Sequence, residues 1–100
     1  MLFEAFGIGI NLSEPPWQEM VESAFTPVRQ RYARAVIKVS VVVERMSGDT
    51  QSAPYRCRAT TDVFGWHSFQ VESDGEGPEA AVNQSAEKLL ATLASILEGA

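Results

Sequence analysis

Apolar residues recur at two spacings along this chain, and the change of spacing divides it into six elements. Alternation at every second residue is typical of a half-buried strand, whereas apolar residues three and four apart form one face of a helix. The approximate elements are strand 2–11, helix 13–32, strands 35–46, 55–63 and 66–73, and helix 78–98. Stretches rich in glycine, proline, serine and aspartate separate them, which indicates turns.

The strand over 35–46 has the clearest alternation. It places Ile37, Val39, Val41 and Val43 on one face and Lys38, Ser40, Val42 and Glu44 on the other. The next strand places Tyr55, Cys57 and Ala59 opposite Arg56, Arg58 and Thr60. A turn near Phe64 and Gly65 then precedes the fourth strand. In the strands over 35–46 and 55–63, the more apolar face is expected to be buried.

Each predicted helix carries one apolar stripe. In the first, Ser13 is placed to cap the first turn, and the stripe comprises Trp17, Met20, Val21, Ala24, Phe25, Val28 and Tyr32. Pro27 lies inside this helix, where it removes a hydrogen bond and clashes with the preceding turn, so a kink or break is expected there. The last helix opens at Pro78, ends at Gly99 and buries Val82, Ala86, Leu89, Leu93, Ile96 and Leu97.

The order β-α-β-β-β-α predicts an α+β fold, a four-stranded sheet with two helices packed on one face. We expect the helices to pack through Trp17, Val21, Phe25, Leu89, Leu93 and Ile96. One hundred residues with 45% hydrophobic content suffice for one core, so residues 1–100 are interpreted as a single domain. The aromatic residues Trp17, Phe25, Trp66 and Phe69 are interpreted as core rather than as stacking platforms.

Composition argues against several functions. Cys57 is the only cysteine, which excludes an internal disulfide and a zinc site built on paired cysteines. Cys57 and His67 lie on separate predicted strands without a third orienting group, so we expect no enzyme, no small-molecule substrate and no cofactor. The acidic stretch 72–79 lacks the ligand spacing of a calcium loop, so no metal is expected. Without a secretory signal or an apolar run of roughly 20 residues, a cytoplasmic protein with no membrane partner is expected.

The charge is unevenly distributed. Residues 27–45 carry five bases and one acid, although the formal net charge of the chain is −5. The bases of this segment are Arg29, Arg31, Arg34, Lys38 and Arg45. From residue 70 onward, six acids accompany Lys88 alone. A basic segment inside an acidic chain indicates a local anion contact, or an ordinary solvated helix end whose cations interact with the helix dipole.

The order of elements, the early Gly7 and the start of the last helix resemble the ribosome hibernation-promoting factor and ribosome-associated inhibitor family. Residues 80–83 read Ala-Ala-Val-Asn where family members have Ala-Ala-Ile-Asp. Residues 87–89 read Glu-Lys-Leu, which matches the acid-Lys-Leu triplet of the family. The resemblance covers nearly the whole chain and supports the α+β fold.

The resemblance implies a non-catalytic translation inhibitor, produced under stress, that binds small-subunit rRNA near the decoding region and silences idle ribosomes. The RNA-binding residues implied are Arg29, Arg31, Arg34, Lys38 and Lys88. Phosphate contacts supply affinity that does not depend on RNA sequence. If the first four of these residues each contact a phosphate, the logarithm of affinity should fall with the logarithm of salt at a slope of roughly −3.

The last helix departs from the family, because its surface is not rich in lysine and arginine. This leaves a second interpretation open, a protein-interaction or dimerisation module of the same fold that has lost RNA binding. Val36, Val42 and Phe64, expected on the exposed side, would serve that function. A double-stranded RNA-binding domain would need a lysine cluster at the start of the last helix, which residues 77–83 lack.

Overall fold

The computed structural model describes residues 1–11, 15–46 and 54–99, with residues 15 and 16 described by their backbone alone. Its elements are β1 (Leu2–Ile8), α1 (Pro15–Tyr32), β2 (Val36–Arg45), β3 (Tyr55–Val63), β4 (Phe69–Gly75) and α2 (Pro78–Leu97). The predicted order β-α-β-β-β-α is confirmed. The capping position predicted for Ser13 lies outside the described residues, as does the turn predicted over 47–54 except for Pro54.

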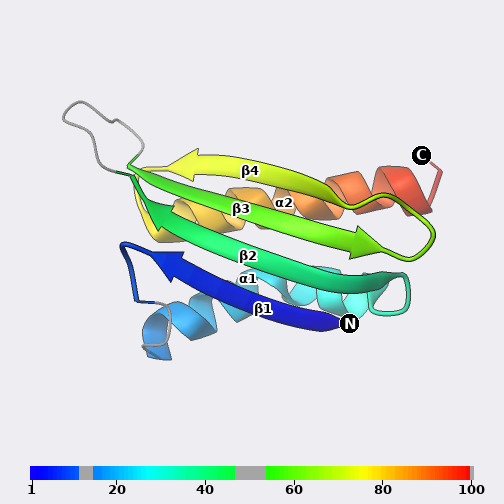
Figure 1. The fold of residues 1–100 in the computed structure, drawn as a ribbon, viewed down its shortest axis with the longest axis horizontal. Helices are drawn as coiled ribbons and strands as arrows, with labels where there is room; N and C mark the ends of the chain where they lie inside the picture. The colour runs from blue at the N-terminus through cyan, green and yellow to red at the C-terminus, as the bar shows by residue number, and fades with distance from the viewer. Residues whose placement is uncertain (12–14, 47–53, 100) are drawn as a thin grey trace.

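The four strands form one sheet in the order β1-β2-β3-β4. β1 runs parallel to β2, with Leu2 opposite Lys38, and the other two pairs are antiparallel. A parallel pair needs a crossover connection, and α1 supplies it. Both helices cover the same face of the sheet, as predicted (Figure 1). The opposite face, called the open face below, is not covered by either helix (Figure 1).

The core lies between the helices and the sheet. Its fully buried side chains include Val21 and Phe25 of α1 and Leu89 and Leu93 of α2, all four of them predicted. Trp17 is partly buried against this core. Ile96 is half-buried, and Leu97 packs against the core in its place. From β2 the core receives Val36, Val39, Val41 and Val43, and from β3 Cys57, Ala59, Thr61 and Val63.

The prediction for the start of β2 is wrong. Val36 is 2% exposed and Ile37 is 53% exposed, the reverse of the expected faces. The pairing of β2 with β3 shifts its register between Val36 and Lys38, which is the signature of a β-bulge. The extra residue changes the alternation, so only Val39 and the residues after it follow the predicted pattern. Val36 is therefore part of the core and not of an exposed interaction surface.

α1 passes through Pro27 without the predicted break. Proline deprives the carbonyl four residues earlier, that of Ser23, of its helical donor. Pro27 and Ser23 both lie on the exposed side of α1, so water can satisfy that carbonyl. The preceding carbonyl, that of Glu22, accepts a 2.9 Å hydrogen bond from the Thr26 hydroxyl. The stripe therefore continues to Tyr32, which is buried.

The fourth strand begins at Phe69, three residues later than predicted, because a turn occupies the preceding residues. The amide of Trp66 donates a 3.0 Å hydrogen bond to the carbonyl of Val63, and Gly65 has a φ of 80°. That left-handed conformation favours glycine in a turn. Trp66 is 56% exposed, so its assignment to the core is wrong, whereas Phe25 is buried and Phe69 is partly buried.

Small residues let α2 approach the sheet closely. A Cβ added to Gly75 would stand 2.6 Å from the backbone nitrogen of Ala81, so only glycine fits there without movement. The buried Ser85 hydroxyl donates a 2.8 Å hydrogen bond to the carbonyl of Cys57.

Burial raises the pKa of the Cys57 thiol to about 11, which makes it a poor nucleophile at neutral pH.

Candidate nucleic-acid interface

The five residues predicted to bind RNA lie in three separate places. Arg29 and Arg31 are in the last turn of α1, and Arg34 is in the turn that follows. Lys38 is on β2, and Lys88 is on α2. We call Arg29, Arg31 and Arg34 the basic end. It combines three cations in six residues at the C-terminus of a helix, where the dipole favours positive charge.

Arg29 is exposed, and its guanidinium lies 5.4 Å from the centre of the Phe3 ring. Phe3 in turn contacts Phe25, with the two ring centres 5.7 Å apart. This stacking holds the guanidinium beside β1, and no carboxylate of the described residues opposes it. The positive charge of Arg29 therefore remains available to an anion.

Arg31 differs from Arg29 because a carboxylate neutralises it. Its Nη2 atom lies 2.8 Å from both carboxylate oxygens of Glu98, which follows the last residue of α2. The Tyr32 hydroxyl donates a 2.5 Å hydrogen bond to the same carboxylate. That hydrogen bond, followed by the bond and charge of Arg31, lowers the pKa of Glu98 below its ordinary value. Arg31 is thus a weaker candidate for a phosphate contact than its position in the sequence suggests.

Arg34 is exposed and has no ion pair or hydrogen bond within residues 1–11, 15–46 and 54–99. A surface hollow of about 420 Å³ lies beside it, and Arg31, Tyr32, Leu97 and Glu98 also line this hollow. A second hollow, of about 320 Å³, is lined by Arg29. The basic end therefore presents two unneutralised guanidinium groups, Arg29 and Arg34, next to concave surface.

Lys38 and Lys88 do not join the basic end. Past the bulge, Lys38 alternates with the buried Val39 and so points to the open face, where its Nζ atom lies 2.5 Å from a carboxylate oxygen of Glu4. This hydrogen bond and the charge of Glu4 raise the pKa of Lys38. Lys88 donates a 2.7 Å hydrogen bond to the backbone carbonyl of Glu72 on β4.

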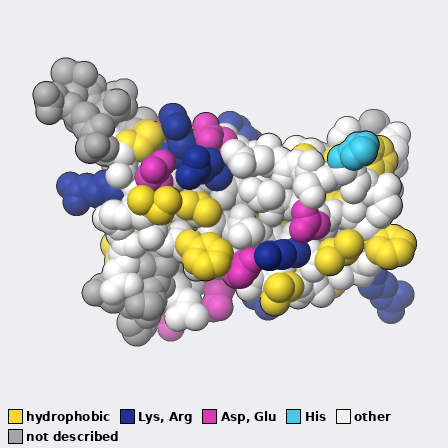
Figure 2. All heavy atoms as spheres, in the orientation of Figure 1, with side chains coloured by type: hydrophobic (Ala, Val, Ile, Leu, Met, Phe, Trp, Pro, Cys, Tyr) yellow, Lys and Arg dark blue, Asp and Glu magenta, His cyan; other side chains and the backbone are white. Residues whose placement is uncertain are grey.

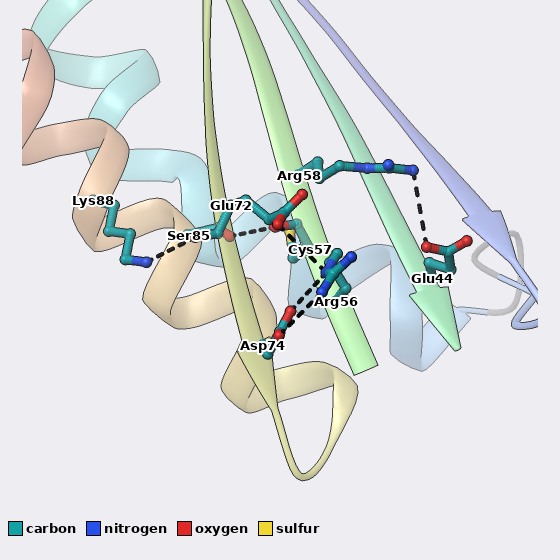
Figure 3. A network of polar contacts seen from close by, with 8 residues as sticks. All are labelled: Glu44, Arg56, Cys57, Arg58, Glu72, Asp74, Ser85 and Lys88. Atoms are coloured by element: carbon teal, nitrogen blue, oxygen red, sulfur yellow. Dashed lines mark hydrogen bonds and ion pairs between the residues drawn. The ribbon is translucent and has the colours of Figure 1, made fainter. Parts of the chain in front are cut away.

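Other cations of the open face are also paired (Figure 3). Arg56 lies 2.8 Å from Asp74 and 3.5 Å from Glu72, and Arg58 lies 4.0 Å from Glu44. The hydrogen bond from Arg56 lowers the pKa of Asp74. The charges of this face thus form a ladder across three strands, which leaves little net positive charge for an anionic partner.

Apolar side chains lie beside that ladder (Figure 2). On β1 they are Leu2, Phe6 and Ile8, which are 59%, 50% and 48% exposed. We call these three residues the β1 apolar row. Val42, expected on the exposed side, is half-buried opposite Phe6. Phe64, also expected there, is 76% exposed but belongs to the turn before β4.

The sequence interpretation missed the aromatic residues next to the basic end. The amide of Phe64 donates a 2.9 Å hydrogen bond to the carbonyl of Ala35, the residue after Arg34. The turn that carries Phe64 and Trp66 therefore lies next to the segment that carries Arg34. The available signal was the Phe-Gly-Trp sequence after a strand, since glycine in a turn exposes its neighbours.

In the part of the chain that the structure describes, no group of three or more His, Cys, Asp or Glu side chains could hold a metal ion. No helix among those residues is both long enough and apolar enough to cross a membrane.

Among known proteins, this chain has matches in solved structures and none by sequence. No protein-family model and no curated protein matches the sequence. The fold is similar to the Protein Y N-terminal domain of Thermus thermophilus, with a TM-score of 0.76, 16% identity, and coverage of 96% of this chain and 99% of the other. It is equally similar to a ribosomal subunit interface protein from Coxiella burnetii, with a TM-score of 0.77, 12% identity, and coverage of 96% and 97%. At these identities the comparison confirms the predicted fold.

Proposed function

We propose that this protein is a cytoplasmic, non-enzymatic translation inhibitor that binds the small ribosomal subunit through rRNA near the decoding region. The observation that carries the proposal is the fold, which is shared over 96% of the chain with a protein named for the ribosomal subunit interface. Residues 80–83 and 87–89, which resemble the hibernation-promoting factors, point the same way.

The basic end supplies the physical means of binding. Arg29 and Arg34 are exposed and lack a carboxylate partner among the described residues, whereas Lys38 is paired. Phosphate contacts from such side chains give affinity independent of base sequence, and folded RNA is recognised mainly by backbone and shape. The proposed contact therefore centres on Arg29 and Arg34, with Arg31, Lys38 and Lys88 contributing less.

Sedimentation with purified small subunits at graded salt tests this proposal. We expect binding at low salt that weakens as salt is raised, and weaker binding with a flatter salt dependence when Arg34 is replaced by alanine. Arg58→Ala is the matched control, because it also removes a surface arginine, but one that lies on β3 and faces Glu44. Absence of the wild-type protein from the subunit pellet at low salt would contradict the proposal.

A competition arm tests the location on the subunit. Subunits preloaded with mRNA and tRNA should bind less protein than empty subunits if the site overlaps the decoding region. Equal binding to both would show that the protein binds elsewhere on the subunit, and would leave ribosome association intact.

The β1 apolar row favours a second candidate function, a dimerisation or protein-interaction module. Three apolar side chains about half exposed on an edge strand form a surface that another chain could cover. Sedimentation equilibrium of the wild type and of Phe6→Glu distinguishes the two. A wild-type dimer that the substitution dissociates would support this candidate, and a monomer at every concentration would contradict dimerisation.

A further inference from the structure

We infer that the turn between β3 and β4 stacks unpaired RNA bases on Phe64 and Trp66, next to the phosphate contact of Arg34. This inference rests on the proposed function in one respect, namely that the partner is RNA. It adds a base-contacting surface to a site so far described by charge alone.

The two rings are exposed to an unusual degree for aromatic side chains. Phe64 is 76% exposed and Trp66 is 56% exposed. Neither ring has an aromatic or cationic partner within the described residues. A single exposed apolar residue is ordinary, but these two are separated by one glycine and stand near Ile37, which is 53% exposed. These exposed apolar side chains lie at the same end of the β2–β3 pair, where a flat partner could contact them.

The turn is held in place before any ligand arrives. Backbone hydrogen bonds join Trp66 to Val63 at 3.0 Å and Phe64 to Ala35 at 2.9 Å. The Ser68 hydroxyl donates a hydrogen bond to Asp62, which ties the end of the turn to β3. Because the backbone under both rings is fixed by these bonds, stacking a base on them costs little ordering of the protein.

The surrounding charge favours RNA over a protein partner. The hydrogen bond from the Phe64 amide to the Ala35 carbonyl brings the turn next to the residue that follows Arg34, whose guanidinium has no carboxylate partner in the described part of the chain. The nearest acid on β3, Asp62, accepts the Ser68 hydroxyl. A cation placed to meet a phosphate and rings placed to meet the adjoining bases are the two components of a single-strand binding surface.

The test compares a short single-stranded RNA with an abasic strand of equal length, which keeps the phosphates and lacks the bases. Fluorescence anisotropy at low salt measures both affinities. We expect the wild type to bind the RNA about 5- to 150-fold more tightly than the abasic strand for each base stacked. Trp66→Ala and Phe64→Ala should lose that advantage and bind the abasic strand as the wild type does.

Two controls separate stacking from loss of apolar surface. Trp66→Phe and Phe64→Tyr keep a ring and should keep most of the advantage. Phe6→Ala removes an aromatic ring that is 50% exposed on β1 and should change neither affinity. Because the substituted side chains are exposed, circular dichroism and urea denaturation should show unchanged folding.

The outcomes distinguish this inference from the proposed function. If Trp66→Ala and Phe64→Ala bind small subunits and RNA like the wild type, the stacking inference is overturned and ribosome binding stands. If the wild type binds RNA through its bases yet does not sediment with subunits, stacking stands and the proposed function fails. Equal wild-type affinity for the RNA and the abasic strand overturns the inference. Self-association that Trp66→Ala abolishes, with RNA binding unchanged, would instead make the turn a protein contact.

Discussion

Replacing Glu98 with glutamine is expected to steepen the salt dependence of RNA binding. The Glu98 carboxylate lies 2.8 Å from the Nη2 atom of Arg31 and neutralises its charge. Glutamine removes the negative charge at nearly the same size. Arg31 should then act as a third phosphate contact beside Arg29 and Arg34.

The magnitude follows from the number of contacts. Each neutralised phosphate contributes a slope of about −0.7 to −0.9 in the logarithm of affinity against the logarithm of salt. Two contacts therefore predict a slope near −1.6 for the wild type, and three predict one near −2.4 for Glu98→Gln. Between about 50 and 200 mM salt, the wild type should lose about tenfold in affinity and the variant about thirtyfold.

Sedimentation with small subunits, or anisotropy with short RNA, measures both slopes. Glu79→Gln is the matched control, because it removes the same charge from the first turn of α2. At about 1.5 Å per residue, Glu79 lies roughly 28 Å along the helix from Glu98, several times the Debye length of about 8 Å at physiological salt. The control should therefore keep the wild-type slope.

Two results would refute this reasoning. An unchanged slope in a folded Glu98→Gln protein would show that Arg31 does not reach a phosphate. A wild-type slope near −3, the value for four contacts, would show that pairing with carboxylates does not withhold Arg31 and Lys38 from RNA.

Three further predictions concern stability and are measured by urea denaturation. Gly75→Ala should lower the free energy of unfolding by about 1–3 kcal/mol, because its Cβ would stand 2.6 Å from helix backbone. Gly77→Ala is the control: it meets nothing within 4 Å and should cost less than about 1 kcal/mol, the loss of a glycine N-cap. Thr61→Val should raise the free energy of unfolding by about 1 kcal/mol, because it removes a buried hydroxyl that has no hydrogen-bond partner among the described residues. Ser85→Ala should lower it by about as much, because it removes a buried hydrogen bond, so equal signs would contradict the assignment. Burial raises the pKa of Cys57 from 9.0 to about 11. The free energy of unfolding that this thiol contributes is therefore complete below pH 9.0 and lost as pH rises through about 11. Over that range the free energy of unfolding of Cys57→Ala should fall less than that of the wild type.

Local patterns predicted most of the fold because burial on a strand or helix repeats with the backbone geometry. Alternation placed Val39, Val41 and Val43 on the buried face, and helical spacing identified the core positions of both helices. The burial of Val36 and the exposure of Ile37 could not be predicted in this way. It arises from a bulge, which depends on how β2 pairs with β3 and not on the sequence of β2 alone.

The candidate site was harder to predict because closeness in sequence is not closeness in space. Arg34 and Lys38 are four residues apart, but the change from a helix end to a strand sends them to different surfaces. The carboxylate that neutralises Arg31 comes from Glu98, 67 residues later. Trp66 was assigned to the core from residue type, which gives the average burial of tryptophan and not its position in a turn.

The position of β1 at the sheet edge has a consequence for the order in which the fold can form. Its register places Leu2 beside Lys38, so pairing must close a long loop through α1, whereas β2, β3 and β4 join neighbours in sequence. The antiparallel strands can therefore assemble first. On a ribosome making this chain, residues 2–8 emerge before their partner exists, and Phe3 and Ala5, which pack against the core in the finished fold, stay in water until β2 arrives. The first strand synthesised is thus expected to be the last one to dock.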